Sequence, residues 1–147
     1  MYKRQDRHRD TFLALLKDSV DVVFANKKEA EMLTAKGPEE SLAELALLSE
    51  IVVVKCGAKG SWIQSGNDKV FVPCNDVKVI DTTAAGDMYA GGFLFGLINQ
   101  KSLEDSGKIA NFCAETVIGK IGARIPTDLR GLVDGYLKTE AELAQVA

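Results

Sequence analysis

The sequence is poor in the residues that most metal and covalent active sites need. His8 is the only histidine, so a catalytic triad built on histidine is not expected. Three widely spaced cysteines, Cys56, Cys74 and Cys113, form no C-x-x-C pair, which makes zinc improbable and predicts free thiols in a reducing cytoplasm. The dinucleotide fingerprint G-x-G-x-x-G and the Walker A motif are both missing, so a Rossmann-type oxidoreductase is a distant alternative.

Strong charge and long apolar runs are also missing. The 147 residues are 46% hydrophobic and 27% charged, as in an ordinary globular domain, and the formal net charge is -3. We therefore expect no nucleic-acid partner and no membrane partner. The first residues are charged rather than apolar, so we expect no signal peptide and a cytoplasmic location.

Strands and helices are predicted to alternate along one domain over residues 1–147. Residues 20–25 and 51–55 are apolar apart from Asp21 and Lys55, which is typical of a parallel sheet with helices on both faces, an α/β fold. A hairpin is predicted over 61–73 and a β-type segment over 76–80. The predicted helices cover 7–18, 27–33, 38–48, 89–98, 103–121 and 129–137.

The most informative stretch runs from Asp81 to Asp87. Small residues at 84–86 let a ligand approach the backbone, and a helix starting there points its free N–H groups at an anion. Asp87, in the first turn, is placed to take a proton from a hydroxyl that attacks a bound phosphate. The alternative is that Asp81 or Asp87 is an ordinary helix cap and residues 84–86 are a tight loop.

A second polar cluster follows residues 20–25. Asn26 and Glu29 have the spacing of a capping box, with asparagine at the N-cap and glutamate at the third helical position. Beside a phosphate site, the same amide and carboxylate could instead order Mg²⁺ and its waters.

A third cluster, Gly57-Ala58-Lys59-Gly60, follows residues 51–55. It leads into a hairpin, so it is either a turn that needs two glycines or a loop that lets a nucleotide lie against the backbone. In the second case Lys59 would lie near the phosphates or the ribose.

Together these motifs resemble the ribokinase-like (PfkB-type) family of sugar and nucleoside kinases. Residues 81–87 stand where the family has D-T-x-G/A-A-G-D, Asn26-x-x-Glu29 matches N-x-x-E, and residues 55–60 resemble the nucleotide loop. The resemblance implies a three-layer, Rossmann-like α/β fold. Members are roughly twice as long, so it also implies that this chain is the C-terminal half only, with the β-sheet lid absent.

The resemblance also implies roles for the site residues. Asp87 would be the catalytic base, and the backbone N–H groups of Ala84, Ala85 and Gly86 would form the anion hole. Ala84 stands where many members have glycine, and a positive φ would strain it.

Further implied roles concern the nucleotide and two cations. Asn26 and Glu29 would help to hold Mg²⁺ and the phosphates, Glu29 through water. Asp81 and Thr83, with backbone carbonyls near Ile118, Ile121 and Ala123, resemble a monovalent-cation site for K⁺. The residues expected to border ATP are Asn26, Lys55, Gly57, Lys59, Gly60 and Asn111, the last of which could equally be a polar residue on a half-buried helix.

The expected function is transfer of the ATP γ-phosphate to a hydroxyl of a small molecule, releasing ADP. The sequences of residues 7–12, 23–26 and 122–126 look most like those of adenosine-kinase-like members of the family, which favours adenosine or a related nucleoside as the acceptor. Ribose or another sugar is the alternative. The acceptor pocket would lie mostly in the other half, so we expect the chain alone to transfer phosphate poorly. A different class of function also remains open, a non-catalytic nucleotide-binding fragment that docks to its N-terminal half or to a homodimer partner.

Overall fold

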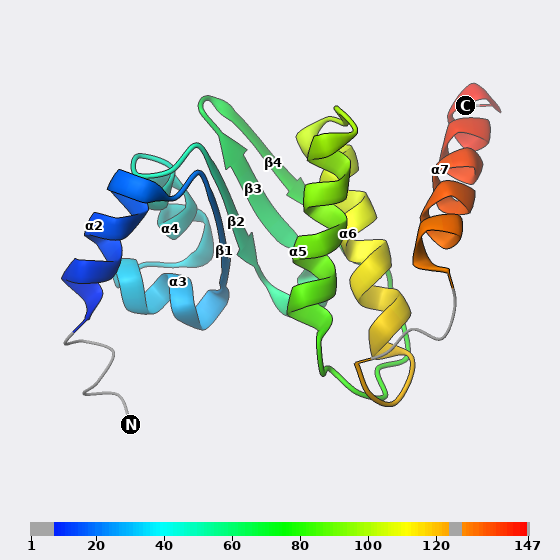
Figure 1. Cartoon of the computed structure of the whole chain (residues 1–147), viewed down its shortest axis with the longest axis horizontal. Coiled ribbons are helices and arrows are strands. Elements are labelled where there is room, and N and C mark those ends of the chain that lie inside the picture. The colour runs from blue at the N-terminus through cyan, green and yellow to red at the C-terminus, as the bar shows by residue number, and fades with distance from the viewer. Residues whose placement is uncertain (1–7, 124–127, 147) are drawn as a thin grey trace. The chain divides into compact units, whose positions relative to one another are not determined.

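The computed structural model describes residues 8–123 and 128–146. These residues form six α-helices, one short 3-10 turn and four strands, coloured along the chain in Figure 1. They divide into two compact units, of which the first ends at Cys74 and the second begins at Asn75.

The first unit alternates between helices and strands before it ends in a hairpin. Its elements are α2 (Arg9–Ser19), β1 (Val22–Asn26), α3 (Lys27–Thr34), α4 (Pro38–Leu45), β2 (Ile51–Lys55), the 3-10 turn η1 (Gly57–Lys59), β3 (Ser61–Ser65) and β4 (Asp68–Val72).

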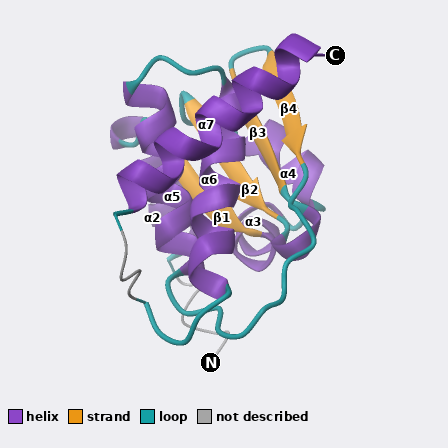
Figure 2. Ribbon diagram, turned by 90° about the vertical axis from the view of Figure 1, so that its right-hand side faces the viewer, coloured by secondary structure: helices purple, strands orange, loops and turns teal. Residues whose placement is uncertain are grey.

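Its four strands form one mixed sheet in the order β1-β2-β3-β4 (Figure 2). β1 and β2 are parallel, as their apolar sequences predicted, and Asn26 lies opposite Lys55 at their carboxyl ends. The predicted hairpin is confirmed as well, and it pairs β3 antiparallel to both β2 and β4. The sheet is therefore parallel only at its first pair, because the connections over residues 56–60 and 66–67 are too short for a parallel crossover.

Local sequence explains where the short helices begin and end. The side chain of Asn26 accepts a hydrogen bond from the Glu29 amide in the first turn of α3, and Pro38 occupies the first turn of α4, where its missing N–H costs nothing. α3 ends at Ala35, whose φ of 59° and ψ of 27° are left-handed. Glycine usually occupies this position because a Cβ is disfavoured there.

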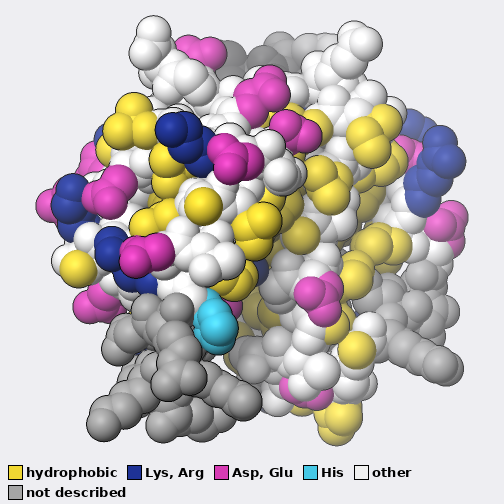
Figure 3. Space-filling model, turned by 60° about the vertical axis from the view of Figure 1, so that its left-hand side comes forward, with side chains coloured by type: hydrophobic (Ala, Val, Ile, Leu, Met, Phe, Trp, Pro, Cys, Tyr) yellow, Lys and Arg dark blue, Asp and Glu magenta, His cyan; other side chains and the backbone are white. Residues whose placement is uncertain are grey.

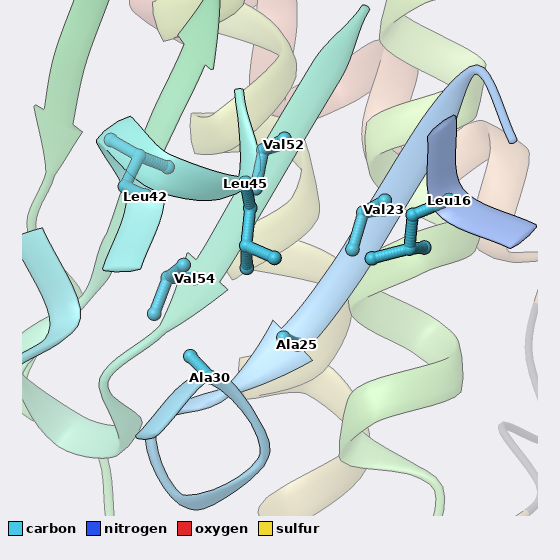
Figure 4. Packing of buried hydrophobic residues seen from close by; sticks show 8 residues of the cluster. All are labelled: Leu16, Val23, Ala25, Ala30, Leu42, Leu45, Val52 and Val54. Atoms are coloured by element: carbon cyan, nitrogen blue, oxygen red, sulfur yellow. The ribbon is translucent and has the colours of Figure 1, made fainter. Parts of the chain in front are cut away.

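One face of the sheet packs against the three helices of the first unit (Figure 4). Alternate residues of β1 and β2 point to this face, as the two-residue period of a strand requires. Each fully buried leucine or valine stabilises the fold by about 1.5–3 kcal/mol relative to its exposed state. The buried cluster consists of Leu16, Val23, Ala25, Ala30, Leu42, Leu45, Val52 and Val54.

The surface carries charges of both signs close together. On the face drawn in Figure 3, basic side chains lie beside acidic ones. Among the described residues of the first unit, two ion pairs are formed: Lys69 Nζ lies 2.6 Å from Glu39 Oε1, and Lys36 Nζ lies 2.7 Å from Glu44 Oε2. Within the part of the chain that the structure describes, no helix has the length and apolarity of a membrane span.

The second unit contains α5 (Ala85–Ile98), α6 (Leu103–Ile118) and α7 (Leu129–Val146). α5 and α6 pack closely because small residues line their contact. A Cβ at Gly92 would lie 3.0 Å from Ala110 Cα, and one at Gly96 would lie 2.7 Å from Ser106 Cα. Both glycines are therefore required by the distance between the two helices.

α7 continues to Val146, beyond the predicted end at residue 137. Residues 138–145 are mostly lysine, glutamate, alanine, leucine and glutamine, which propagate a helix once it has started. Its inner face packs on α6 through Val133, and the rings of Phe112 and Tyr136 stack at 4.6 Å.

The predicted β-type segment over residues 76–80 is wrong. The structure has no strand there, and Val79 and Ile80 are 54% and 52% exposed. The amide of Ile80 donates to the carbonyl of Ile118 at 2.8 Å, so the segment bonds to the end of α6 instead of to a neighbouring strand. Three β-branched residues in a short run could not reveal this partner.

The predicted end of the long helix at Gly122 is also wrong, since α6 ends at Ile118. In a continued helix, the Gly122 amide would donate to the Ile118 carbonyl. That carbonyl instead accepts the amides of Ile80 and Asp81, and the Gly122 amide donates to Asp81 Oδ2 at 2.9 Å. Both groups are occupied by the segment before α5, and the helix stops.

We predict that Leu42→Ala lowers the free energy of unfolding by about 2–5 kcal/mol, because it opens a cavity in the fully buried cluster. Leu47 is 83% exposed just after the same helix, and Leu47→Ala should change the value by less than about 0.5 kcal/mol. Urea unfolding of the two variants, followed by circular dichroism, measures the difference. Equal midpoints would contradict the assignment of this core.

Candidate functional site

The predicted site residues fall into two groups, one in each unit. The first unit contributes Asn26, Glu29, Lys55, Gly57, Lys59 and Gly60. The second contributes Asp81, Thr83, Ala84, Ala85, Gly86, Asp87 and Asn111.

Asn26 and Glu29 form a complete capping box at the start of α3. The Glu29 amide donates to Asn26 Oδ1 at 3.0 Å, and the Asn26 amide donates to Glu29 Oε2 at 2.7 Å. Both side chains are exposed. The predicted capping role is confirmed, and a role in ordering Mg²⁺ stays a prediction that the exposed carboxylate is chemically able to fulfil.

The first group converges at the carboxyl ends of β1 and β2. Asn26 and Lys55 are register partners across the parallel pair, and the η1 turn begins two residues after Lys55. From the sequence, the polar residues after β1 and those after β2 were predicted as separate clusters. The register of the two parallel strands brings both clusters to one edge of the sheet.

The η1 turn depends on two glycines. Gly57 has φ 62° and Gly60 has φ 118°, both in the region that favours glycine. The turn closes through the Cys56 amide, which donates to the Gly60 carbonyl at 2.8 Å, and the Gly60 amide, which donates to the Gly57 carbonyl at 3.1 Å. A Cβ on Gly60 would overlap the carbonyl oxygen of Val72, whereas one on Gly57 would meet open space.

All three cysteines are free thiols, as predicted. Burial raises the pKa of Cys113 to about 11, and burial also raises the pKa of Cys56 against the opposing charges of Lys27 and Lys59. Both thiols therefore stay protonated at neutral pH and are weak nucleophiles. The Cys74 thiol donates to the Gly57 carbonyl at 3.7 Å and so supports the η1 turn.

The start of α5 has the features of an anion site. Ala84 is its N-cap, with φ 63° and ψ 4°, and no side chain accepts a hydrogen bond from the first turn. The Ala85 amide donates to the Thr82 carbonyl at 3.2 Å, so one of the three predicted anion-hole donors has an internal acceptor. Asp87 is exposed in the first turn and does not cap the helix.

Asp81 binds the neighbouring backbone instead of capping α5. Its Oδ1 accepts both the amide and the hydroxyl of Thr83, at 2.9 and 2.7 Å, and its Oδ2 accepts the Gly122 amide at 2.9 Å. These bonds, the Thr83 hydroxyl first, hold the pKa of Asp81 below its usual value of 3.8. Since they are made to the carboxylate, they are present at neutral pH and weaken as the pH falls through that lowered pKa.

Asn111 lies on α6 and is only 4% exposed. The alternative of a polar residue on a largely buried helix face fits this position, and contact with a nucleotide stays a prediction.

The contact between Asn75 and Glu115 was not predicted from the sequence. The amide and the side-chain Nδ2 of Asn75 donate to the two carboxylate oxygens of Glu115, at 2.8 and 3.0 Å. One signal was available, since Glu115 is an acidic residue in the last turn of a helix that has no basic residue there. Acids are unfavourable at that end of the helix dipole.

Gly60→Ala should lower the free energy of unfolding by at least about 2 kcal/mol, because the new Cβ meets the Val72 carbonyl in a strained conformation. Gly57→Ala is the matched control. It should cost about 1 kcal/mol, the price of a left-handed alanine alone. Thermal unfolding separates the two, and equal losses would show that Gly60 does not approach β4.

Ala84→Gly should raise the free energy of unfolding by about 0.5–1 kcal/mol, since glycine relieves the left-handed strain. Ala35→Gly relieves the same strain at the end of α3 and should give a similar gain. Chemical unfolding of both variants checks this. A gain at Ala35 together with a loss at Ala84 would show that residue 84 is not left-handed in solution.

Known proteins share sequence similarity and fold with this chain. Residues 2–130 match the pfkB family of carbohydrate kinases. An uncharacterized sugar kinase from Archaeoglobus fulgidus is 40% identical over 106 residues, which are 70% of this chain and 42% of that protein.

Two solved structures are similar as well. An adenosine kinase from Sinorhizobium meliloti is 38% identical, with a TM-score of 0.83 over 88% of this chain and 41% of that one. A fructokinase from Vibrio cholerae, solved with fructose, ADP and calcium, is 34% identical, with a TM-score of 0.69 over 78% of this chain and 40% of that one. This chain thus spans less than half the length of the relatives it matches. The family match covers most of its residues, and the chain belongs to the pfkB family of carbohydrate kinases.

Proposed function

We propose that the protein containing this chain transfers the γ-phosphate of ATP to a hydroxyl of adenosine or a related nucleoside. The observation that carries the proposal is the start of α5, where an uncapped helix end lies next to the exposed carboxylate of Asp87. Membership of a family of kinases supports reading this helix end as a phosphate site.

In the proposed reaction, the acceptor oxygen attacks the γ-phosphorus and a new O–P bond forms. The bond from that phosphorus to the bridging oxygen breaks, and ADP leaves with the electron pair. Asp87 takes the proton of the attacking hydroxyl. The backbone N–H groups at Ala84 and Gly86 stabilise the charge on the transferring group, and Ala85 joins them when its bond to Thr82 opens.

We assign nucleotide binding to the edge of β1 and β2. The η1 turn leaves the backbone at Gly57 open to a ligand, and the exposed Lys59 adds a positive charge. Bound Mg²⁺ would neutralise charge on the phosphates. Glu29 is suited to hold it through water, because one carboxylate oxygen is committed to the Asn26 amide and the other lies in an exposed side chain.

We also propose a monovalent-cation site for K⁺ at the end of α6. The Ile118 carbonyl and the Asp81 carboxylate gather negative charge at the negative end of the helix dipole. Thr83 holds one Asp81 oxygen in place. Asp81 Oδ2 accepts the Gly122 amide and has a second lone pair, which leaves room for a cation at that oxygen.

The acceptor is the least constrained part of the proposal. The similarity to an adenosine kinase supports a nucleoside, whereas the similarities to a sugar kinase and a fructokinase support a sugar as the second candidate. Because the chain spans less than half of these proteins, we propose that the rest of the acceptor pocket comes from polypeptide that this chain does not include. If the chain instead served only as a nucleotide-binding fragment, it would bind Mg-ATP without supporting turnover in any context.

Asp87→Asn in the full-length protein should lower kcat by about 10²–10⁴-fold, because the carboxamide cannot take the proton. Asp10→Asn is the matched control, since Asp10 also lies in the first turn of a helix, in the first unit, and its loss should leave kcat unchanged. Coupled ADP release with adenosine, ribose and fructose measures both variants and identifies the acceptor.

Binding is checked separately, by the rise in Tm with Mg-ATP. The rise should be equal in the parent and in Asp87→Asn, because a ligand of the native state stabilises it whether or not it reacts. Full turnover by Asp87→Asn would reject this residue as the base. A normal Tm rise without turnover on any acceptor would favour the fragment that only binds nucleotide.

A further inference from the structure

The contact between Glu115 and Asn75 places a carboxylate where a helix disfavours one. Glu115 lies in the last turn of α6, against the negative end of the dipole, and that turn contains no basic residue. Both of its carboxylate oxygens accept hydrogen bonds from Asn75, 40 residues earlier in the chain. Charge-assisted pairs of this kind fix geometry as well as adding energy.

The segment that Glu115 holds has no helix or strand of its own. Among the described residues, the hydrogen bonds from positions 75–81 to other elements go to Glu115, to the Ile118 carbonyl and to the Gly122 amide. Glu115 and Ile118 lie three residues apart in the last turn of α6, and Gly122 lies in the irregular backbone that follows it. The path of residues 75–81 is therefore determined by the end of α6.

That segment leads directly to the start of α5. Asp81 binds Thr83, the Thr82 carbonyl accepts the Ala85 amide, and α5 begins. α5 is in turn packed closely on α6 through Gly92 and Gly96. Residues 82–86 thus connect the segment 75–81 to α5, and both of these are fixed to α6. A shift of the segment would change the direction of the amides at the start of α5.

We propose that Glu115 is a positioning residue for this loop. Through Asn75 it holds residues 75–81 on α6 and so sets the place of the Ala84–Gly86 amides. The proposal rests on the proposed function only in its consequence for phosphate transfer; its structural part stands on the contacts alone.

Hydrogen exchange tests the structural part. In Glu115→Ala, the amides of residues 75–87 should exchange about three- to tenfold faster, the size expected for losing solvent-accessible charge-assisted bonds. The amides in the middle of α6 should be unchanged, and Tm should change little, because the loss of the Asn75 bonds is offset by the removal of an unfavourable charge from the helix end. Should the alanine variant fail to fold, Glu115→Gln gives the same test, since it replaces one of the two acceptor oxygens with an NH2 group that cannot accept from Asn75.

Glu104→Ala is the matched control. Glu104 is a carboxylate on the same helix whose ion pair, with Lys108 at 2.8 Å, stays within α6. Exchange over residues 75–87 that is no faster in Glu115→Ala than in Glu104→Ala would overturn the proposal.

Kinetics test the consequence in the full-length protein. Glu115→Ala should lower kcat about three- to tenfold with a smaller change in the acceptor KM, and Glu115→Gln should recover part of the loss. Unchanged kcat in Glu115→Ala, with turnover still lost in Asp87→Asn, would overturn the positioning role while leaving the proposed function intact. A parent protein that phosphorylates no acceptor would reject the proposed function, and the exchange data would still decide the structural part.

Discussion

The arrangement of the second unit depends on an exchange of hydrogen bonds at the end of α6. The Ile118 carbonyl and the Gly122 amide would bond to each other in a longer helix, and here both bond to the segment before α5. Asp81 Oδ2 accepts the Gly122 amide, and the Asp81 amide donates to the Ile118 carbonyl. One residue thus ends α6, anchors the irregular segment and fixes the turn that opens α5.

A rigid support lies behind the candidate anion site. Gly92 and Gly96 bring α5 close to α6, so the helix end cannot move without disturbing a tightly packed contact. Ala84 nevertheless keeps a left-handed backbone that glycine would adopt more easily. Strain of this kind persists only where the surroundings determine the conformation, and the contacts of Asp81 with its neighbours do so here.

Sequence alone predicted the features that are set by near neighbours. The capping box at Asn26, the strand at 51–55 and the hairpin after Gly60 all depend on residues within a few positions of one another. The failures at residues 76–80 and at the end of α6 occurred where the partner is distant, whereas the end of α7 was placed too early although residues 138–145 favour a helix. Residues 76–80 looked like a strand because their bonds to Ile118 are invisible in the local pattern. The pairing of Asn75 with Glu115 spans 40 residues, and its one sign in the sequence is an acidic residue in the last turn of a helix.

Two of the groups that hold this segment lie on α6, which makes the length of that helix part of the site. The Glu115 carboxylate and the Ile118 carbonyl are three residues apart in its last turn and both bond to residues 75–81, and the Gly122 amide adds a third bond beyond the helix end. Inserting or deleting a single residue between Asn111 and Glu115 would rotate everything after it by about 100° relative to the face packed on α5. Insertions and deletions should therefore be excluded from this turn, even where individual substitutions are tolerated.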